Sequence, residues 1–271
     1  MKRLAALLVL LAQPAWAFDI TLSGRMEQGA LITGIAPVGS TITYNGHMVA
    51  TSAHGGFVFG IDRDAPATAT LKVTDAMGAV ETRTLQIAKR DWKIDRVDGV
   101  PQKLVTPDPE TAAKIIAENK IMAEARNKLE LTPFYETGFM RPVEGGRISG
   151  QFGSQRILNG TPGSPHLGMD FAGPIGTPIH ASADGVVTLQ HPDMIMTGNT
   201  VVLNHGYGLE TVYIHMSKIL VTDGQRVKQG DIIGEIGMTG RANGPHLHFG
   251  VTWFNTRLDP ETVLATLPPK G

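Results

Sequence analysis

The sequence of 271 residues contains no cysteine. Disulfide bonds and thiolate metal or redox sites are therefore excluded, and any metal must be bound by histidine and carboxylate side chains. The formal net charge is only −1, and lysine and arginine form no dense block. We therefore expect no electrostatic capture of nucleic acid or of an anionic membrane surface. Hydrophobic residues make up 42% of the chain, which excludes wholesale disorder.

No stretch of the sequence reaches the length of a transmembrane helix. The N-terminus instead combines a positive start at residues 1–3, an apolar run at residues 4–12 and the small-residue pattern Ala-Trp-Ala at residues 15–17. This layout predicts a secretory signal peptide over residues 1–17. We expect export to the periplasm or the cell-wall exterior, with no stable membrane anchor after cleavage.

Glycine (32 residues) and proline (17 residues) favour many tight turns and short strands over a helical bundle. Within residues 18–88, apolar residues alternate with others, as at Phe57, Phe59 and Ile61. Asn45-Gly46 predicts a two-residue hairpin, because such turns need positive φ at both central residues. We expect a small β-sandwich here, which is similar to immunoglobulin-like or transthyretin-like modules.

A helical linker is expected over residues 89–140. Asp108 followed by Pro109 is typical of a helix start, and Thr132-Pro133 is typical of a helix end. The sequence therefore predicts one helix at about residues 109–131, either packed on a neighbour or acting as a spacer. Its expected apolar stripe consists of Ala113, Ala117, Ile121, Ala125 and Leu129.

Residues 141–271 are predicted to form a C-terminal antiparallel β-sheet domain, either closed or sandwiched, so that the whole chain is mainly β. Short apolar segments such as residues 200–203 and 211–214 are separated by glycines. Seven of the nine histidines lie in this part, between His166 and His248.

Two short motifs carry the chemistry. His246 and His248 are two apart on a predicted strand, so both imidazoles would face the same side while Leu247 faces the core. His166 and Asp170 form a second pair in a predicted loop that leads into a strand. One imidazole of the first pair would join the second pair in a three-ligand zinc site, with water in the fourth position.

His215 ends a third predicted strand. A single histidine on a strand is usually structural. Here the other two motifs favour a position in which His215 faces the same cleft as their side chains.

Residues 146–260 closely resemble the lysostaphin/LytM-type zinc peptidases, peptidase family M23. The order and spacing of the motifs are kept over about 115 residues. The matching motifs are Gly146-Arg147-Ile148-Ser149, Phe152-Gly153, His166-Leu167-Gly168-Met169-Asp170, Ala183-Asp184-Gly185-Val186-Val187, Tyr213-Ile214-His215-Met216-Ser217, Gly237-Met238-Thr239-Gly240 and Gly244-Pro245-His246-Leu247-His248-Phe249.

The resemblance implies specific roles. His166, Asp170 and His248 correspond to the ligands of one zinc ion, and His215 and His246 correspond to the non-ligand catalytic histidines, with their division of labour left open. It further implies a secreted zinc metalloendopeptidase that uses metal-activated water to hydrolyse peptide cross-links or stem peptides of bacterial peptidoglycan. The sequence identifies no regulatory partner.

Two departures from the family pattern are mild, since neither removes an implied site residue. Ile214 and Met216 flank His215 in place of the usual alanine and leucine, and Gly250 stands where glutamate often follows. The remaining histidines of this part match no ligand position and are expected at loops or strand ends. They are His180, His191 and His205.

Two other functions are weighed against the peptidase. The first is a non-catalytic LytM-like protein that activates or binds another cell-wall hydrolase. The second is a lipoyl-like carrier, which the glycine pattern of residues 224–240 suggests but which would not need the histidines. For the N-terminal sandwich and linker, wall binding, partner binding and covering of the cleft all remain open.

Overall fold

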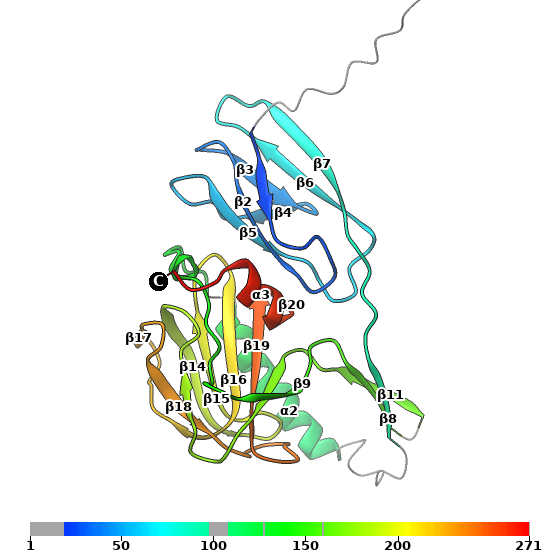
Figure 1. Cartoon of the computed structure of the whole chain (residues 1–271), viewed down its shortest axis with the longest axis vertical. Helices are drawn as coiled ribbons and strands as arrows, with labels where there is room; N and C mark the ends of the chain where they lie inside the picture. The colour runs from blue at the N-terminus through cyan, green and yellow to red at the C-terminus, as the bar shows by residue number, and fades with distance from the viewer. Residues whose placement is uncertain (1–18, 98–107, 127, 159, 271) are drawn as a thin grey trace, which may run out of the picture.

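The structure is a computed structural model that describes residues 19–97, 108–126, 128–158 and 160–270. The predicted signal peptide at residues 1–17 lies outside these ranges. The predicted fold class is confirmed: the chain is mainly β, with an N-terminal β part above a larger C-terminal antiparallel sheet (Figure 1).

The N-terminal part consists of two facing antiparallel sheets with the strand orders β1-β2-β5 and β4-β3-β6-β7. The strands are β1 (Thr21–Ser23), β2 (Leu31–Ile35), β3 (Thr41–Tyr44), β4 (His47–Val49), β5 (Gly56–Gly60), β6 (Thr68–Thr74) and β7 (Val80–Gln86). In β6, Leu71 and Val73 are buried while Lys72 between them is exposed, as expected for a sheet with one covered face. Asn45 and Gly46 both have positive φ, 48° and 81°, which confirms the predicted hairpin.

The main C-terminal sheet has the antiparallel order β17-β14-β15-β16-β19-β12-β9. In addition, β18 pairs with β13 and β16, and β20 pairs with β19. The strands are β9 (Arg147–Gly150), β12 (Met169–Ala172), β13 (Pro178–His180), β14 (Gly185–Met194), β15 (Gly198–Asn204), β16 (Leu209–Ile219), β17 (Arg226–Val227), β18 (Ile232–Ile236), β19 (His246–Trp253) and β20 (Thr256–Leu258).

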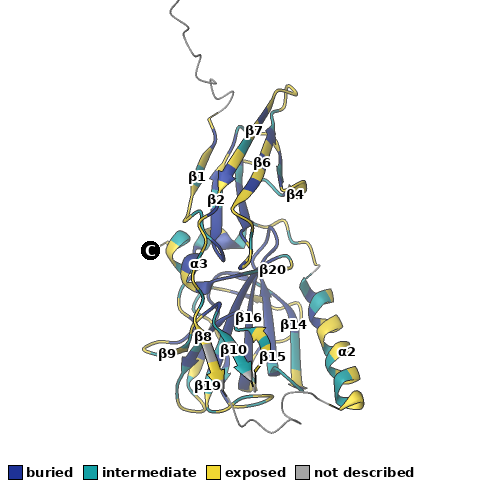
Figure 2. Cartoon of the chain, turned by 90° about the vertical axis from the view of Figure 1, so that its right-hand side faces the viewer, coloured by how far each residue is buried: buried dark blue, intermediate teal, exposed yellow. Residues whose placement is uncertain are grey.

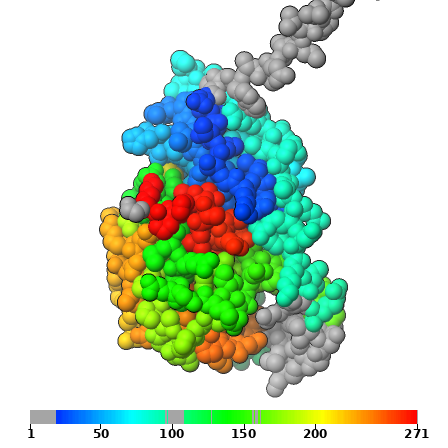
Figure 3. Space-filling model, viewed as in Figure 1, coloured from blue at the N-terminus to red at the C-terminus, as the bar shows by residue number. Residues whose placement is uncertain are grey.

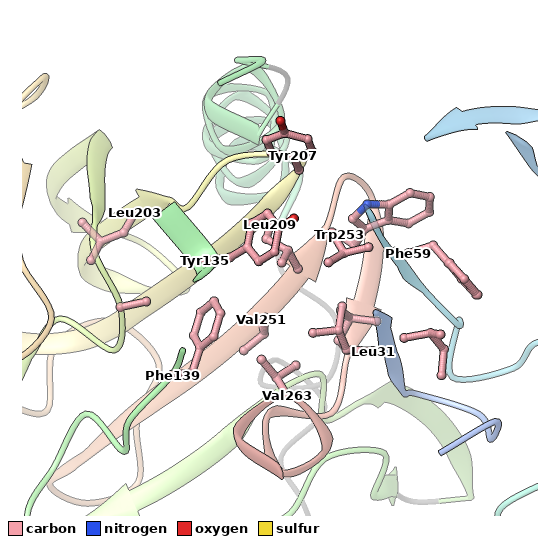
Figure 4. Packing of buried hydrophobic residues seen from close by; sticks show 14 of the residues in the cluster. Leu31, Phe59, Tyr135, Phe139, Leu203, Tyr207, Leu209, Val251, Trp253 and Val263 are labelled. Atoms are coloured by element: carbon pink, nitrogen blue, oxygen red, sulfur yellow. The ribbon is translucent and has the colours of Figure 1, made fainter. Parts of the chain in front are cut away.

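One continuous hydrophobic core joins the two β parts. Tyr44 stacks on Phe59 with ring centroids 4.4 Å apart and meets Trp253 of β19 edge-on at 6.3 Å. Helix α3 (Pro260–Thr266) contributes the fully buried Val263 to this core (Figure 4). The space-filling view shows the C-terminal segment in direct contact with the N-terminal sandwich (Figure 3). Burial of shared apolar surface therefore holds the two parts together.

Part of the predicted linker is a strand that the sequence analysis did not predict. Strand β8 (Ile94–Val97) pairs in parallel with β10 (Gln155–Leu158), which also pairs with β11 (Thr161–Pro165). The segment that follows the N-terminal sandwich thus adds a strand to a hairpin of the C-terminal part (Figure 1).

Helix α2 (Pro109–Arg126) begins where the sequence predicts, with the Asp108 carboxylate accepting a backbone N–H of its first turn. The predicted end near residue 131 is wrong, because the helix ends at its Arg126. Beyond it the Lys128 carbonyl accepts a hydrogen bond from the side-chain amide of Asn204 instead of a helical N–H. The short 3₁₀ helix η1 (Phe134–Thr137) follows.

The predicted apolar stripe of α2 is also wrong in most of its members. Met122 and Ala125 are the buried residues, whereas Ile121 is 36% exposed. The helix lies against one face of the sheet, with an exposed outer side (Figure 2). Its two buried side chains pack on Leu189, Met194, Val202, Val212 and Ile214. Within the described ranges, no helix has the length and hydropathy needed to cross a lipid bilayer.

A buried carboxyl group lies on the same strand that α2 covers. Glu210 of β16 is fully buried, and burial raises its pKa to about 8 although the cations Arg126, Arg257 and Lys128 oppose the shift. Its folded pKa is thus above the unfolded value, so its proton stabilises the fold at low pH. This stabilisation is lost as the pH rises from about 4.5 through about 8.

We therefore expect Glu210→Gln to flatten the pH dependence of stability. The compared quantity is the difference between the free energies of unfolding of the wild type and the variant. As the pH rises from 5 to 8, the advantage of the wild type should decrease by at most about 1.4 kcal/mol per pH unit. Urea unfolding of both proteins at several pH values measures this difference. Parallel pH profiles would contradict the assignment of Glu210 as a proton-binding group of the fold.

Candidate metal centre

Asp170 and His248 are side by side on two paired strands. In the register of β12 with β19, Asp170 is the direct partner of His248, and Ala172 is the partner of His246. Leu247, between the two histidines, is fully buried in the core. Because side chains alternate along a strand, both imidazoles lie on the opposite side from Leu247. The strand register expected for the His-x-His pair is the one observed.

Three donor atoms converge at this point. His166, which directly follows β11, has its Nε2 2.9 Å from Asp170 Oδ1 and 2.9 Å from His248 Nδ1. His248 Nδ1 is also 2.9 Å from Asp170 Oδ1. All three lie within 4.8 Å of one another and their residues are partly exposed. Two imidazole nitrogens and one carboxylate oxygen in this arrangement fit a small divalent cation such as zinc.

The backbone fixes the orientation of the His166 ring. His166 Nδ1 is 2.9 Å from the carbonyl oxygen of Gln151. A carbonyl oxygen only accepts, so Nδ1 carries the proton and the Nε2 lone pair faces Asp170 and His248. This tautomer is the one that a metal ligand requires.

Glycine is needed at two positions around the donor atoms. A Cβ at Gly150 would lie 2.3 Å from Asp170 Oδ2, and a Cβ at Gly168 would lie 2.5 Å from His248 Nε2. Any larger residue at these positions would displace a donor side chain, so these glycines shape the site.

The electrostatics favour a charged carboxylate beside neutral imidazoles. Burial by itself raises the pKa of Asp170, but the close approach of the His166 and His248 imidazoles outweighs it and holds the pKa well below its usual range. Burial lowers the pKa of His248, against the opposing effect of the nearby Asp170 carboxylate. Near neutral pH, Asp170 is therefore ionised and His248 is neutral, which are the states that bind metal.

Two further histidines border the donor atoms. The rings of His215 and His246 have centroids 4.8 Å apart. His215 Nδ1 is 2.8 Å from the Thr239 carbonyl oxygen, and His246 Nδ1 is 2.8 Å from the Gly244 carbonyl oxygen. In each neutral ring, Nε2 is therefore left as the basic nitrogen. His246 Nε2 lies 3.9 Å from Asp170 Oδ1.

The backbone at His215 is unusual. Its φ is 64°, a left-handed conformation that non-glycine residues seldom adopt. Its N–H donates to the Thr197 carbonyl at 2.8 Å, which holds this conformation in place. Burial lowers the pKa of His215 to about 4, with the hydrogen bond to Thr239 opposing the shift, so the ring is neutral near pH 7.

The structure brings together all five residues singled out in the sequence, and it places the other three histidines of this part in separate contacts. Each of these three has a ring nitrogen within hydrogen-bond distance of a backbone carbonyl oxygen. The contacts are His180 with Gly230 at 2.8 Å, His191 with Pro192 at 2.6 Å and His205 with Asp184 at 2.6 Å.

Sequence reasoning missed the backbone groups that orient the rings. The carbonyls of Gln151 and Thr239 act through their position alone, so no residue type at these positions signals the role. Gly168 could have been found from the sequence, because it lies inside the motif that begins at His166 and ends at Asp170. Gly150 could not, because it is the last residue of β9 and meets Asp170 only through strand pairing.

Comparisons with known proteins agree with this geometry. Residues 164–260 match the model of peptidase family M23. The peptidoglycan DD-endopeptidase ShyA of Vibrio cholerae is 51% identical over 106 residues, which cover 38% of this chain and 24% of ShyA. The DD-carboxypeptidase/endopeptidase Mpg of Neisseria meningitidis is 41% identical over 103 residues, 38% of this chain and 24% of Mpg. The similarity thus spans about a quarter of the length of these relatives.

A solved structure extends the similarity to almost the whole chain. The crystal structure of a candidate M23 peptidase from Pseudomonas aeruginosa is 27% identical and covers 92% of this chain and 94% of its own, with a TM-score of 0.67. The likeness therefore includes the N-terminal β part as well as the segment with the donor residues. Residues 164–260 of this chain thus match peptidase family M23, within a fold that is similar to that of a candidate M23 peptidase over almost its whole length.

Proposed function

We propose that this protein is an exported zinc-dependent endopeptidase that hydrolyses peptide cross-links or stem peptides of bacterial peptidoglycan. The observation that carries the proposal is the convergence of His166, Asp170 and His248 inside the segment that matches family M23. Relatives of this segment are named as peptidoglycan DD-endopeptidases, which supports the substrate class. The signal-peptide pattern at residues 1–17 supports export.

His166 Nε2, His248 Nδ1 and an oxygen of Asp170 are the groups that would hold zinc. When bound, zinc lowers the pKa of a coordinated water toward about 7 and polarises a substrate carbonyl. The chain contributes the ligand set with the tautomer of His166 already fixed by Gln151. A carboxylate and two neutral imidazoles leave a net charge of about +1 on the loaded site, which favours developing negative charge on the substrate.

His215 and His246 are placed for the proton transfers. Both rings have Nδ1 bound to a backbone carbonyl, so Nε2 of each is available to accept a proton from the attacking water or to return one to the leaving amine. Once protonated, either imidazole would also stabilise the developing oxyanion. We assign the two rings jointly to these steps.

A non-catalytic activator is the weaker alternative. Such a protein has no need for a complete donor set, whereas here the three donor side chains are within mutual contact distance and two more histidines border them.

Digestion of purified peptidoglycan tests the proposed function. The mature protein with one equivalent of zinc should convert cross-linked muropeptides into shorter products, and mass spectrometry of the digest should identify the cleaved bond. The same preparation treated with a chelator should leave the peptidoglycan intact, and added zinc should restore cleavage. Unchanged cleavage without metal would contradict a zinc mechanism, and no cleavage by the zinc-loaded protein would contradict the hydrolase assignment.

A further inference from the structure

The turn at residues 151–154 is tied to His166 by three hydrogen bonds. The Gly153 N–H donates to the His166 carbonyl at 2.8 Å, and the His166 N–H donates to the Ser154 carbonyl at 2.7 Å. The His166 ring adds the contact from Nδ1 to the Gln151 carbonyl at 2.9 Å. The place of the His166 imidazole therefore depends on the place of this turn.

An arginine of the N-terminal sandwich binds the same turn. Arg63, in the connection between β5 and β6, donates from both Nε and Nη2 to the Gly153 carbonyl, at 3.2 and 2.7 Å. Its residue is only 7% exposed, and its Nη1 binds Asp64 Oδ1 at 2.6 Å. Hydrogen bonds from a charged, buried donor are stronger than those between neutral groups. Arg63 thus fixes Gly153 from a position 90 residues away in the sequence.

Trp92 covers the other side of Gly153. Gly153 has a φ of +82°, and a Cβ there would lie 2.0 Å from Trp92 Cε3, so the indole packs directly on this glycine. The guanidinium carbons of Arg63 and Arg90 lie 5.0 and 4.5 Å from the Trp92 ring centroid. Phe152 meets the indole edge-on at 5.7 Å. These cation–π and aromatic contacts fix the indole in place.

The backbone after Trp92 continues the same attachment. The Lys93 carbonyl accepts from the Gln155 N–H at 2.8 Å, and β8 then pairs with β10 along its length. The hairpin of β10 and β11 ends at Pro165, directly before His166. The Gln155 end of this segment is thus bonded to Lys93, and its His166 end is bonded to the turn that Arg63 binds.

We propose that Arg63 and Trp92 are positioning residues for the metal ligand His166, an inference that rests on the zinc site of the proposed function. Both act through Gly153, which they hold in the place where its N–H donates to the His166 carbonyl. With the turn fixed, His166 Nε2 meets Asp170 and His248 before metal binds. The N-terminal sandwich is thereby a part of the metal-binding apparatus.

Zinc affinity measured by competition with a chromogenic chelator tests this inference on the full mature protein without any substrate. Outer partners of metal ligands typically contribute 10–100-fold to affinity. We expect Arg63→Ala to weaken zinc binding by about tenfold, at the lower end of this range because Arg63 acts through the backbone. Arg63→Lys keeps one donor for the Gly153 carbonyl, so its affinity should lie between those of the wild type and Arg63→Ala.

Arg83→Ala is the matched control. Arg83 is also a poorly exposed arginine of the sandwich, but it binds Glu81 Oε1 at 2.7 Å and the Ile20 carbonyl at 2.8 Å. Its loss should disturb the sandwich and leave zinc affinity within twofold of the wild type. Equal weakening by Arg63→Ala and Arg83→Ala, or a folded Arg63→Ala protein with wild-type affinity, would overturn the inference.

A second measurement covers the case in which Arg63→Ala fails to fold. Trp92→Phe keeps an aromatic ring but loses part of the indole that packs on Gly153, so it should weaken zinc binding several-fold. In the metal-free form of this variant, the Gly153 and His166 amides should exchange hydrogen about tenfold faster, with unchanged exchange in β15 and β16. Wild-type exchange and affinity in Trp92→Phe would overturn the inference. Zinc binding by the wild type without cleavage of peptidoglycan would instead refute the proposed function alone.

Discussion

The substitution Asp170→Ala is expected to remove both bound zinc and hydrolytic activity. Asp170 supplies the only negative charge among the three donor side chains, and its Oδ1 is the atom that both His166 Nε2 and His248 Nδ1 approach at 2.9 Å. Without it, two neutral imidazoles remain, and they bind a divalent cation far more weakly. Since even outer partners of metal ligands contribute 10–100-fold, we expect a fall in the rate of muropeptide release of roughly 10³-fold or more.

Elemental analysis and the initial rate of muropeptide release measure the two effects on the same Asp170→Ala preparation. Asp170→Asn retains an oxygen donor without the charge and should lie between the wild type and Asp170→Ala in zinc content. Glu235→Ala is the control, because Glu235 is a half-exposed carboxylate of β18 whose ion pair with Lys218 lies outside the donor group. An Asp170→Ala protein with one tightly bound zinc and wild-type activity would refute the metal-centre assignment.

Local patterns predicted those parts of the fold that local forces determine. Period-two alternation gave the strand that carries His246 and His248, because a strand with one buried face must place Leu247 in the core and its neighbours outside. Asn45-Gly46 predicted a hairpin because few other residue pairs tolerate positive φ at both positions. Alignment with the family's motif order then assigned the donor roles that periodicity alone left open between the two histidines.

The buried face of α2 was harder to predict, because apolar and polar residues are not clearly separated onto different faces of this helix. Alanines recur at four-residue spacing, but the sheet offers a hydrophobic patch around Val212 and Ile214, and Met122 fits it better than Ile121 does. Tertiary packing decides which face of a weakly amphipathic helix is buried. The same holds for its end, where the Lys128 carbonyl binds Asn204 instead of continuing the helix.

Contacts between distant segments were not predictable from the sequence. The β8–β10 pair joins residues about 60 positions apart, and β11 contains two prolines, which normally argue against a strand and are tolerated here at a sheet edge. The approach of Arg63 to the Gly153 carbonyl leaves no periodic signal either. The predicted division into an N-terminal sandwich, a linker and a C-terminal domain therefore gave no sign of the hydrophobic core that the two β parts share.

Replacement of His215 is expected to reduce turnover while leaving zinc in place. His215 adopts a φ of 64°, so asparagine is the better test residue, because it tolerates this conformation more readily than alanine does. The His215→Asn variant retains a polar side chain but no group that accepts a proton near neutral pH. General acid–base catalysis contributes about 10²–10⁴-fold to a rate, so we expect kcat to decrease by a factor in this range.

The contrast with Asp170→Ala makes the His215→Asn result specific. The donor atoms of His166, Asp170 and His248 are unaffected by the substitution, so zinc content and zinc affinity should remain within about twofold of the wild type, and KM should change much less than kcat. His246→Asn should show the same pattern if the two rings share the proton transfers. Loss of zinc in His215→Asn would show that His215 takes part in metal binding. An unchanged kcat would exclude His215 from proton transfer. The reason is that Nδ1 of the neutral ring donates to the Thr239 carbonyl, so Nε2 is the one ring nitrogen that can accept a proton.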